Sequence, residues 1–289
     1  MNINWIGYSL VVFLGIAAFT VAARKAKSVG VLDRQIQILA IILPLCGSLA
    51  FGLVFARFDT LTLTDLIETI ALAIILGYLS GRFVVSGTVS DVDRLLVTTS
   101  SKIYGLAAVL IAGTFMGAAV GWRQGLASFI ITAGALMVIF EGVSFKLALS
   151  RRTFLVVAVA VGAPLLTTLV ARALFDGGLT VAPFLVCYNA ALLACLLIHD
   201  QLDLRTAFKG IERGQWFWLL IASLAAAVFV AAQFAAIAIA PNPGYAGVAE
   251  AAAVGFVAVI DVFAFKDGLT LRRAIGVFML TIGLGLLLS

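Results

Sequence analysis

Ionisable side chains inside long apolar stretches are the residues of this sequence best placed to do chemistry. Four of them stand out, namely Glu68, Lys102, Glu250 and Asp261. An unpaired charge in an apolar environment is costly, so each must be paired, hydrated or used. Lys102 could bind an anionic group, and Glu250 could bind an ammonium group or a coupling proton. The alternative is that each is paired with a neighbouring helix for stability, or extends its charged end to an interface.

Asp261 follows Glu250 by eleven residues, so one helix would project both side chains from nearly the same face. Two carboxylates along one cavity wall would suit a proton- or cation-linked path. Asp261 could instead lie near a helix end, balanced by Lys266 or Arg272.

Uncharged polar and aromatic residues in the same stretches could contact a ligand. The candidates are Tyr78, Tyr104, Tyr188, Asn189 and Gln233. Tyr78 and Tyr104, together with Tyr245, predict an aromatic-walled pocket. Hydrogen bonds between helices are the other use of Asn189 and Gln233. The four tryptophans lie near predicted helix ends, which is typical of an interfacial belt.

Residues for catalysis or metal binding do not cluster in the sequence. His199 is the only histidine, and the three cysteines show no CxxC spacing. A zinc site needs three or four such ligands. We therefore expect no enzyme activity, no metal and no cofactor.

Composition indicates a membrane protein. The chain is 63% hydrophobic and 11% charged, with a mean hydropathy of +1.19, whereas a soluble domain has about 25% charged residues. Lys and Arg are spread singly or in small groups between apolar stretches, so nucleic-acid binding is not expected. The expected partners are membrane lipid and a small-molecule substrate, with the protein as a monomer or a homodimer.

Ten stretches have the roughly twenty apolar residues that a membrane-spanning helix needs. The sequence therefore predicts an all-α integral membrane protein with short links. The predicted helices are 3–22, 36–56, 62–83, 95–116, 122–141, 153–174, 180–198, 215–240, 245–265 and 270–288.

Lys and Arg predict the orientation of these helices. Fifteen lie in odd-numbered links and three in even-numbered links. Cytoplasmic links are enriched in these residues, so both termini are predicted to lie outside. We expect a multi-pass protein of the plasma membrane, with a bacterial inner membrane favoured.

The predicted helix starts also give depths for two of the charged residues. At about 1.5 Å per residue, Lys102 should lie roughly 5 Å to the cytoplasmic side of the midplane, and Glu250 roughly 7 Å to the other side. The two are therefore predicted to flank one central cavity without pairing directly.

A weak internal repeat relates the two halves of the chain. An offset of 149 aligns residues 93–140 with 242–289 without a gap, and the helix–hinge–helix layout coincides. Five-helix units repeated in this way have opposite orientations, because five is odd. Inverted repeats of this kind build alternating access in many transporters.

The final stretch TLRRAIGVFMLTIGLGLLL, after a helix ending in FAFKD, resembles the end of EamA-type permeases of the drug/metabolite transporter superfamily. The stretch GWRQGLASFIITAGALMVI from Gly121 is similar to the same element. The family has an acidic hinge residue where this chain has Lys266–Asp267 and Gly117–Ala118. The resemblance implies two inverted five-helix repeats, residues 1–145 and 150–289.

These observations predict a secondary transporter, an exporter or exchanger of a small metabolite, coupled to protons or uncoupled. Its cavity is expected between the third, fourth, eighth and ninth helices. The alternative is a flippase or scramblase of a lipid-linked substrate, with headgroup contacts from Arg82 or Arg172, or a non-transporting membrane assembly subunit.

Overall fold

The computed structural model describes residues 4–54, 58–59, 61–87, 100–139, 151–199, 204–264, 266, 268 and 270–289. These residues form helices and connecting turns, with no strand among them. The helices are α1 (Asn4–Ser28), α2 (Asp33–Val54), α3 (Leu63–Leu72), the π-helix η1 (Ala73–Leu79), α4 (Ser80–Gly87), α6 (Tyr104–Phe115), α7 (Trp122–Ile139), α8 (Arg151–Asp176), α9 (Val181–Ile198), α10 (Leu204–Ala207), α11 (Arg213–Ile239), α12 (Gly244–Ala264) and α13 (Leu271–Leu288).

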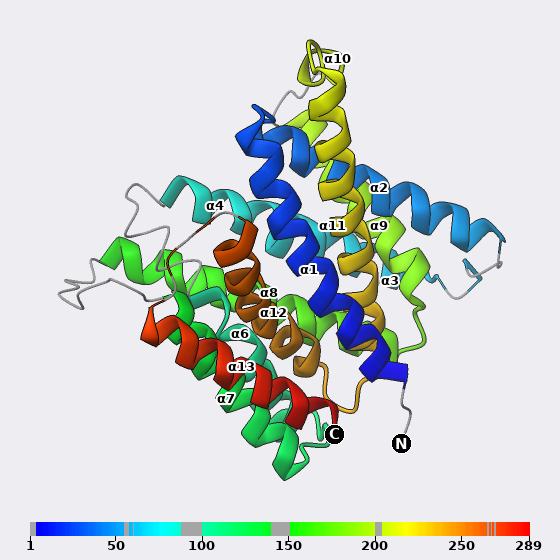
Figure 1. The fold of residues 1–289 in the computed structure, drawn as a ribbon. Coiled ribbons are helices and arrows are strands. Elements are labelled where there is room, and N and C mark those ends of the chain that lie inside the picture. Colours follow the sequence, from blue (N-terminus) through cyan, green and yellow to red (C-terminus); the bar gives the residue numbers. More distant parts are fainter. Residues whose placement is uncertain are drawn as a thin grey trace.

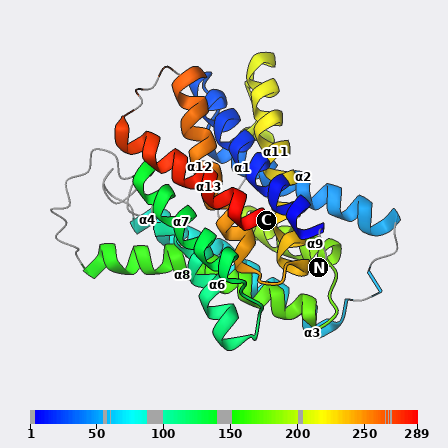
Figure 2. The same cartoon turned by 60° about the horizontal axis from the view of Figure 1, so that its bottom comes forward.

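Nine apolar spans in the described part of the chain are long enough to cross a membrane. The third is continuous through α3, η1 and α4. A tenth predicted helix is present as the shorter α6, and residues 88–99 lie outside the described part. The all-α membrane architecture is therefore confirmed. Figures 1 and 2 show the start of α1 and the end of α13 close together, and Trp5 shares a core cluster with Leu287.

The third span begins at a polar cap and widens near its middle. The Thr62 hydroxyl accepts a hydrogen bond from the Asp65 amide at 3.1 Å, and the Asp65 carboxylate accepts one from the Thr62 amide at 3.1 Å. This capping box satisfies donors that a helix start leaves open. The π-helical turns of η1 follow, a feature that is often found at functional sites.

Neighbouring helices pack in a regular set of pairs. The strongest contacts join α1 to α11 and α7 to α13, and the next join α2 to α9, α1 to α12, α2 to α11 and α6 to α12. Both views show α12 between α13 and α1, with α7 beside α13. Small residues permit the closest approach: a Cβ added at Gly134 would lie 2.9 Å from the carbonyl oxygen of Gly276.

The α6–α12 pair is held by glycines and a buried turn. A Cβ added at Gly105 would lie 2.5 Å from the backbone of Gly247, so the two helices touch through their main chains. The turn before α12 is buried, and the side-chain amide of Asn242 donates to the Val109 carbonyl at 3.0 Å. The start of α12 is therefore inside the protein.

One tryptophan, Trp5, does not lie where the sequence predicted. Trp5 is buried, and its ring centroid is 5.5 Å from that of Tyr245. The interfacial-belt prediction is wrong for Trp5, because the turn before α12 brings an aromatic ring against the start of α1. Trp122 is exposed on α7.

Candidate functional site

Four polar side chains predicted as site candidates form one hydrogen-bonded cluster, which we call the wall network: Lys102, Tyr104, Gln233 and Glu250. The Lys102 ammonium lies 2.8 Å from Glu250 Oε1, and the Tyr104 hydroxyl donates to Glu250 Oε2 at 2.6 Å. The Gln233 amide donates to the Tyr104 oxygen at 3.0 Å and to Glu250 Oε2 at 3.4 Å. The side chains of Lys102 and Glu250 are only 15% and 13% exposed. Both carboxylate oxygens are thus satisfied.

The prediction that Lys102 and Glu250 do not pair is wrong. It assumed that both helices begin at a membrane surface. Instead, the turn around Asn242 is buried, and Lys102 lies in a turn just before α6. Because α6 and α12 run antiparallel through the contact of Gly105 with Gly247, Lys102 and Glu250 lie opposite each other.

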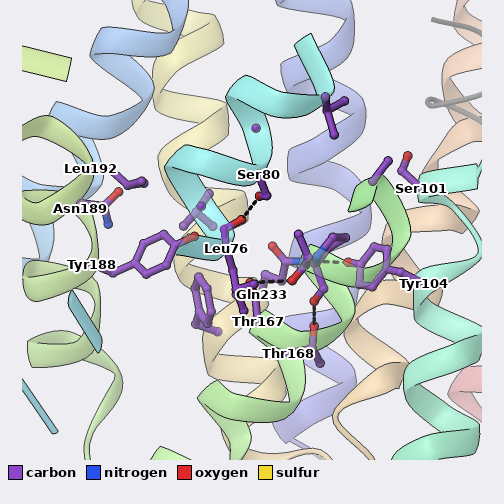
Figure 3. Close-up of a pocket in the computed structure, with 18 of the residues that line it drawn as sticks. Leu76, Ser80, Ser101, Tyr104, Thr167, Thr168, Tyr188, Asn189, Leu192 and Gln233 are labelled. Carbon is purple, nitrogen blue, oxygen red and sulfur yellow. Dashed lines mark hydrogen bonds between the residues drawn. The ribbon is translucent and has the colours of Figure 1, made fainter. Parts of the chain in front are cut away.

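On one side of the wall network lies the central cavity, of about 490 Å³. It is bounded by α2, the third span, α8, α9 and α11, together with Ser101 and Tyr104. Figure 3 shows the side chains that converge on it. The polar groups lining it are Ser80, Ser101, Tyr104, Thr167, Thr168, Tyr188, Asn189 and Gln233. None of the described residues that line it carries a carboxylate, ammonium or guanidinium group.

Several of these polar groups donate their own proton within a helix. Thr167, Thr168 and Asn189 each donate to the carbonyl oxygen four residues earlier, at 2.8 to 2.9 Å. Their remaining lone pairs are therefore available as acceptors. Figure 3 shows the Tyr188 ring directed into the cavity.

A second space, the side cavity, adjoins the central cavity. It measures about 520 Å³ and contains Tyr78 and Arg82. The Tyr78 hydroxyl is 2.8 Å from His199 Nδ1, and the Arg82 guanidinium donates to the Tyr78 oxygen at 3.2 Å. Both cavities are lined by Gly77 and Gly81 of the third span, as well as by two apolar residues of α2 and α9. The two spaces therefore share four lining residues, two of which are glycines.

On the far side of the wall network lies the charged cavity, of about 410 Å³, between α1, α7, α12 and α13. Lys102, Glu250, Asp261 and Arg273 line it. Asp261 lies 2.7 Å from the guanidinium of Arg24, so this acid is balanced by α1. Glu250 and Asp261 do share one cavity wall, as their spacing predicted.

The remaining candidates are dispersed. Glu68 is exposed on α3 and does not line the central, side or charged cavity. The expected pocket walled by three tyrosines is wrong: Tyr104 lines the central cavity, Tyr78 the side cavity, and Tyr245 packs in a core cluster. Each tyrosine lies on a different span: Tyr78 on the third span, Tyr104 on α6 and Tyr245 on α12.

The lining helices also differ from those predicted. The third, fourth and eighth spans line the central cavity, but α2, α8 and α9 contribute as well. The ninth, α12, reaches it only through the wall network. Thr167 and Thr168 were missed by sequence reasoning. The available signal was a helix proline, Pro164, followed three and four residues later by two hydroxyl side chains within an apolar stretch.

Arg172 is tied to another helix. Its guanidinium donates to the carbonyls of Ile237 and Ala240 at 3.0 and 2.8 Å, at the end of α11, and to Asp176 at 2.9 Å. A cation satisfies the open carbonyls of a helix C-terminus. The alternative role of Arg172 in binding lipid headgroups is therefore not favoured.

Within the described residues, His, Cys, Asp and Glu side chains form no group of three that would hold a metal ion. No family model and no curated protein matches the chain. Solved structures do match, as 28 chains. One, described only as "Crystal structure of protein", is 13% identical with a TM-score of 0.71, covering 98% of this chain and 96% of that chain. At this identity the likeness shows the fold alone.

Proposed function

We propose that the protein is a secondary transporter that moves a small metabolite through the central cavity by alternating access. The observation that carries this proposal is the cavity itself. It lies among helices from both halves of the chain and has hydroxyl and amide groups on an otherwise apolar wall. Concave, mostly apolar sites with a few convergent polar groups are typical of small-molecule binding.

The proposed architecture is two inverted repeats, residues 1–145 and 150–289. Its first support is the set of helix pairs. In chain order the ten spans are α1, α2, the third span (α3, η1 and α4), α6, α7, α8, α9, α11, α12 and α13. The first span packs on the eighth and the third on the sixth. The second, fourth and fifth spans pack on the seventh, ninth and tenth, respectively. Exchanging the first five spans for the last five leaves these five pairs unchanged, whereas the contact of α7 with α12 has no comparable counterpart between α13 and α6. A two-fold axis between the repeats would produce this pattern.

The second support is local. Gly117 and Lys266 are separated by 149 residues, the offset of the sequence repeat, and their φ values are 65° and 58°. Positive φ is uncommon at a non-glycine residue such as Lys266, and its occurrence at the position that matches Gly117 favours a common origin of the two hinges. Gly134 contacts Gly276, and their repeat equivalents, Gly283 and Ala127, also meet, with 3.3 Å between a Cβ added at Gly283 and the Ala127 carbonyl.

We further propose membership of the EamA-type permeases in the drug/metabolite transporter superfamily. The sequence resemblance in the two hinge-and-helix elements supports it, as does the pairing of the spans. The fold likeness to solved structures is compatible with it. We place the protein in the plasma membrane of a bacterium, with both termini outside.

The central cavity favours a substrate that forms hydrogen bonds and has no net charge. Its described lining offers hydroxyl and amide groups, and Lys102 and Glu250 neutralise each other in the wall. A lone ion in this site would have no opposite charge in direct contact. The side and charged cavities lie at the helix ends that Lys and Arg assign to the cytoplasm, so we propose that both cavities face inward.

Ligand-dependent thermal unfolding of the purified full chain tests this proposal. A panel should contain sugars, polyols, nucleosides, amino acids, amines and organic acids. At about 100 times its Kd, a bound solute stabilises the protein by about 2.7 kcal/mol. We expect an uncharged class to raise the unfolding temperature of the wild type and of Leu155→Phe, but not of Val159→Phe.

Val159 and Leu155 form a matched pair on α8. Val159 lines the central cavity, whereas Leu155 is exposed on the outside of the same helix. Phenylalanine at Val159 would occupy cavity space. Equal stabilisation of both variants would place the ligand outside the central cavity and contradict the proposal.

A further inference from the structure

The wall network separates two cavities of different chemistry. Tyr104 and Gln233 line the central cavity, while Lys102 and Glu250 line the charged cavity. One hydrogen-bonded set of four side chains therefore has a face toward each space. A change in charge or hydrogen bonding on one face of this network can therefore alter the hydrogen bonds on the other face.

We propose that Glu250 takes up a proton from the charged cavity, and that Tyr104 and Gln233 transmit this change to the central cavity. The proposal rests on the proposed transport function, since it gives that transporter separate routes for substrate and coupling proton. It differs from competition of a substrate and a proton for one carboxylate, because the described central cavity lining does not include Glu250.

The geometry fits a proton better than a metal ion. Glu250 Oε1 already has an ammonium nitrogen at 2.8 Å, in the position that a bound cation would need. Hard cations also need several oxygen ligands, and no acidic cluster is present among the described residues. A proton needs one carboxylate oxygen and no further ligand.

The step is a simple protonation. A water-borne proton in the charged cavity binds Glu250 Oε1 and converts the carboxylate to a neutral carboxylic acid. The Lys102 ammonium keeps its own protons and loses its ion-pair partner, so the network gains one positive charge. A neutral carboxyl accepts hydrogen bonds less strongly than a carboxylate. The Tyr104 hydroxyl and Gln233 amide are then freer to bond to the contents of the central cavity.

The surroundings of Glu250 include other charged groups. Lys102 and Tyr104 face it from the α6 side, and Arg273 lines the same cavity from α13. Asp261 lies further along α12 and is paired with Arg24 of α1. From α7 the cavity receives Val138 and Ile139, and α11 contributes the uncharged Gln233. Asp261 is thus the alternative proton acceptor that an experiment must separate from Glu250.

Infrared difference spectroscopy of the full chain in liposomes tests the proton site, with the proton as the only probe. Acidification protonates exposed carboxylates in every variant, so the test is one separate carbonyl band of a low-exposure carboxyl group, present in the wild type and in Asp261→Asn. The band should be missing in Glu250→Gln and in the double variant Lys102→Met/Glu250→Gln, which leaves no lone charge behind. A band that persists in both Glu250 variants would overturn the proposal.

Cysteine labelling tests transmission to the central cavity. After replacement of Cys46, Cys187 and Cys195 by alanine, Val159→Cys reports on the central cavity and Val257→Cys on the charged cavity. Because thiol ionisation itself makes labelling depend on pH, each rate is divided by that of the exposed reference Ser28→Cys. We expect acidification to change this relative rate at Val159→Cys by about tenfold, within the usual range of coupling between sites. The relative rate should not depend on pH when Glu250→Gln is added.

Tyr104→Phe supplies the decisive control, because it removes only the hydroxyl that joins the two faces of the wall. The infrared band should remain in Tyr104→Phe, while the relative labelling rate at Val159→Cys no longer follows pH. Blocking Val257→Cys with a bulky thiol reagent should slow proton uptake at Glu250. Continued pH dependence of labelling in Tyr104→Phe, or unaltered uptake after the block, would refute the relay.

These measurements need no transported solute. A failed relay with an intact solute response at Val159 would leave the transport proposal standing. A working relay without any solute response would instead remove the transport proposal and keep the proton site.

Discussion

Glu250 and Lys102 form a low-exposure ion pair, and its contribution to the stability of the fold depends on the presence of both partners. Removing one partner of a buried pair leaves an uncompensated charge, at a cost of about 3–5 kcal/mol. Glu250→Ala and Lys102→Ala should therefore unfold at clearly lower temperature than the wild type. Chemical or thermal unfolding in detergent measures this.

The double variant Lys102→Met/Glu250→Gln is the control for that prediction. Replacing both charges by neutral side chains of similar volume is often neutral or stabilising, so most of the lost stability should return. Equal instability of the single and double variants would show that the ion pair is not the cause.

Residue identities were easier to predict from sequence than residue contacts. Lys102, Tyr104, Gln233 and Glu250 were all selected as polar groups in apolar helices, and the structure brings them together. Their pairing was missed because depth was counted from assumed surface positions of the helix starts. The buried polar side chain of Asn242, between two prolines, was the residue that upset this count.

At the scale of elements, the contact of α6 with α12 fixes the register of the wall network. A methyl group at Gly105 would clash with the Gly247 backbone, whereas one at Gly162 of α8 meets nothing within 4 Å. Overpacking typically costs about 1–3 kcal/mol. We therefore expect Gly105→Ala to lower the unfolding temperature and to disrupt the Lys102–Glu250 pair.

Gly162→Ala should be neutral or slightly stabilising, since alanine favours a helix by about 1 kcal/mol over glycine. The comparison separates the close approach of helices from the general effect of glycine in a helix. Unchanged stability of Gly105→Ala would contradict the described contact.

Helix positions followed from hydropathy, because every long apolar stretch in the described chain became a helix. The π-helical conformation of η1 could not be predicted from hydropathy, because the sequence Ala73–Leu79 is that of an ordinary apolar helix. Its position beside Tyr188 depends on packing: a Cβ added at Gly77 would lie 2.8 Å from the Tyr188 hydroxyl. Such distant contacts have no local sequence signal.

For the whole molecule, the distribution of Lys and Arg predicts an orientation that labelling can check. Ser28 ends α1 in an odd-numbered link, and Ser289 ends the printed chain; both are exposed. In a cysteine-free background, Ser289→Cys should react with an impermeant maleimide in intact cells. Ser28→Cys should react only after permeabilisation, and the reverse result would invert the assigned direction of the cavities.

The most direct test of transport through the central cavity is solute uptake into proteoliposomes. The account predicts saturable uptake of at least one uncharged, hydrogen-bonding solute by the wild type and by Leu155→Phe. Val159→Phe, equally folded, should transport no faster than empty liposomes. Saturable uptake at the same rate in both variants, or no saturable uptake of any solute in the panel, would contradict it.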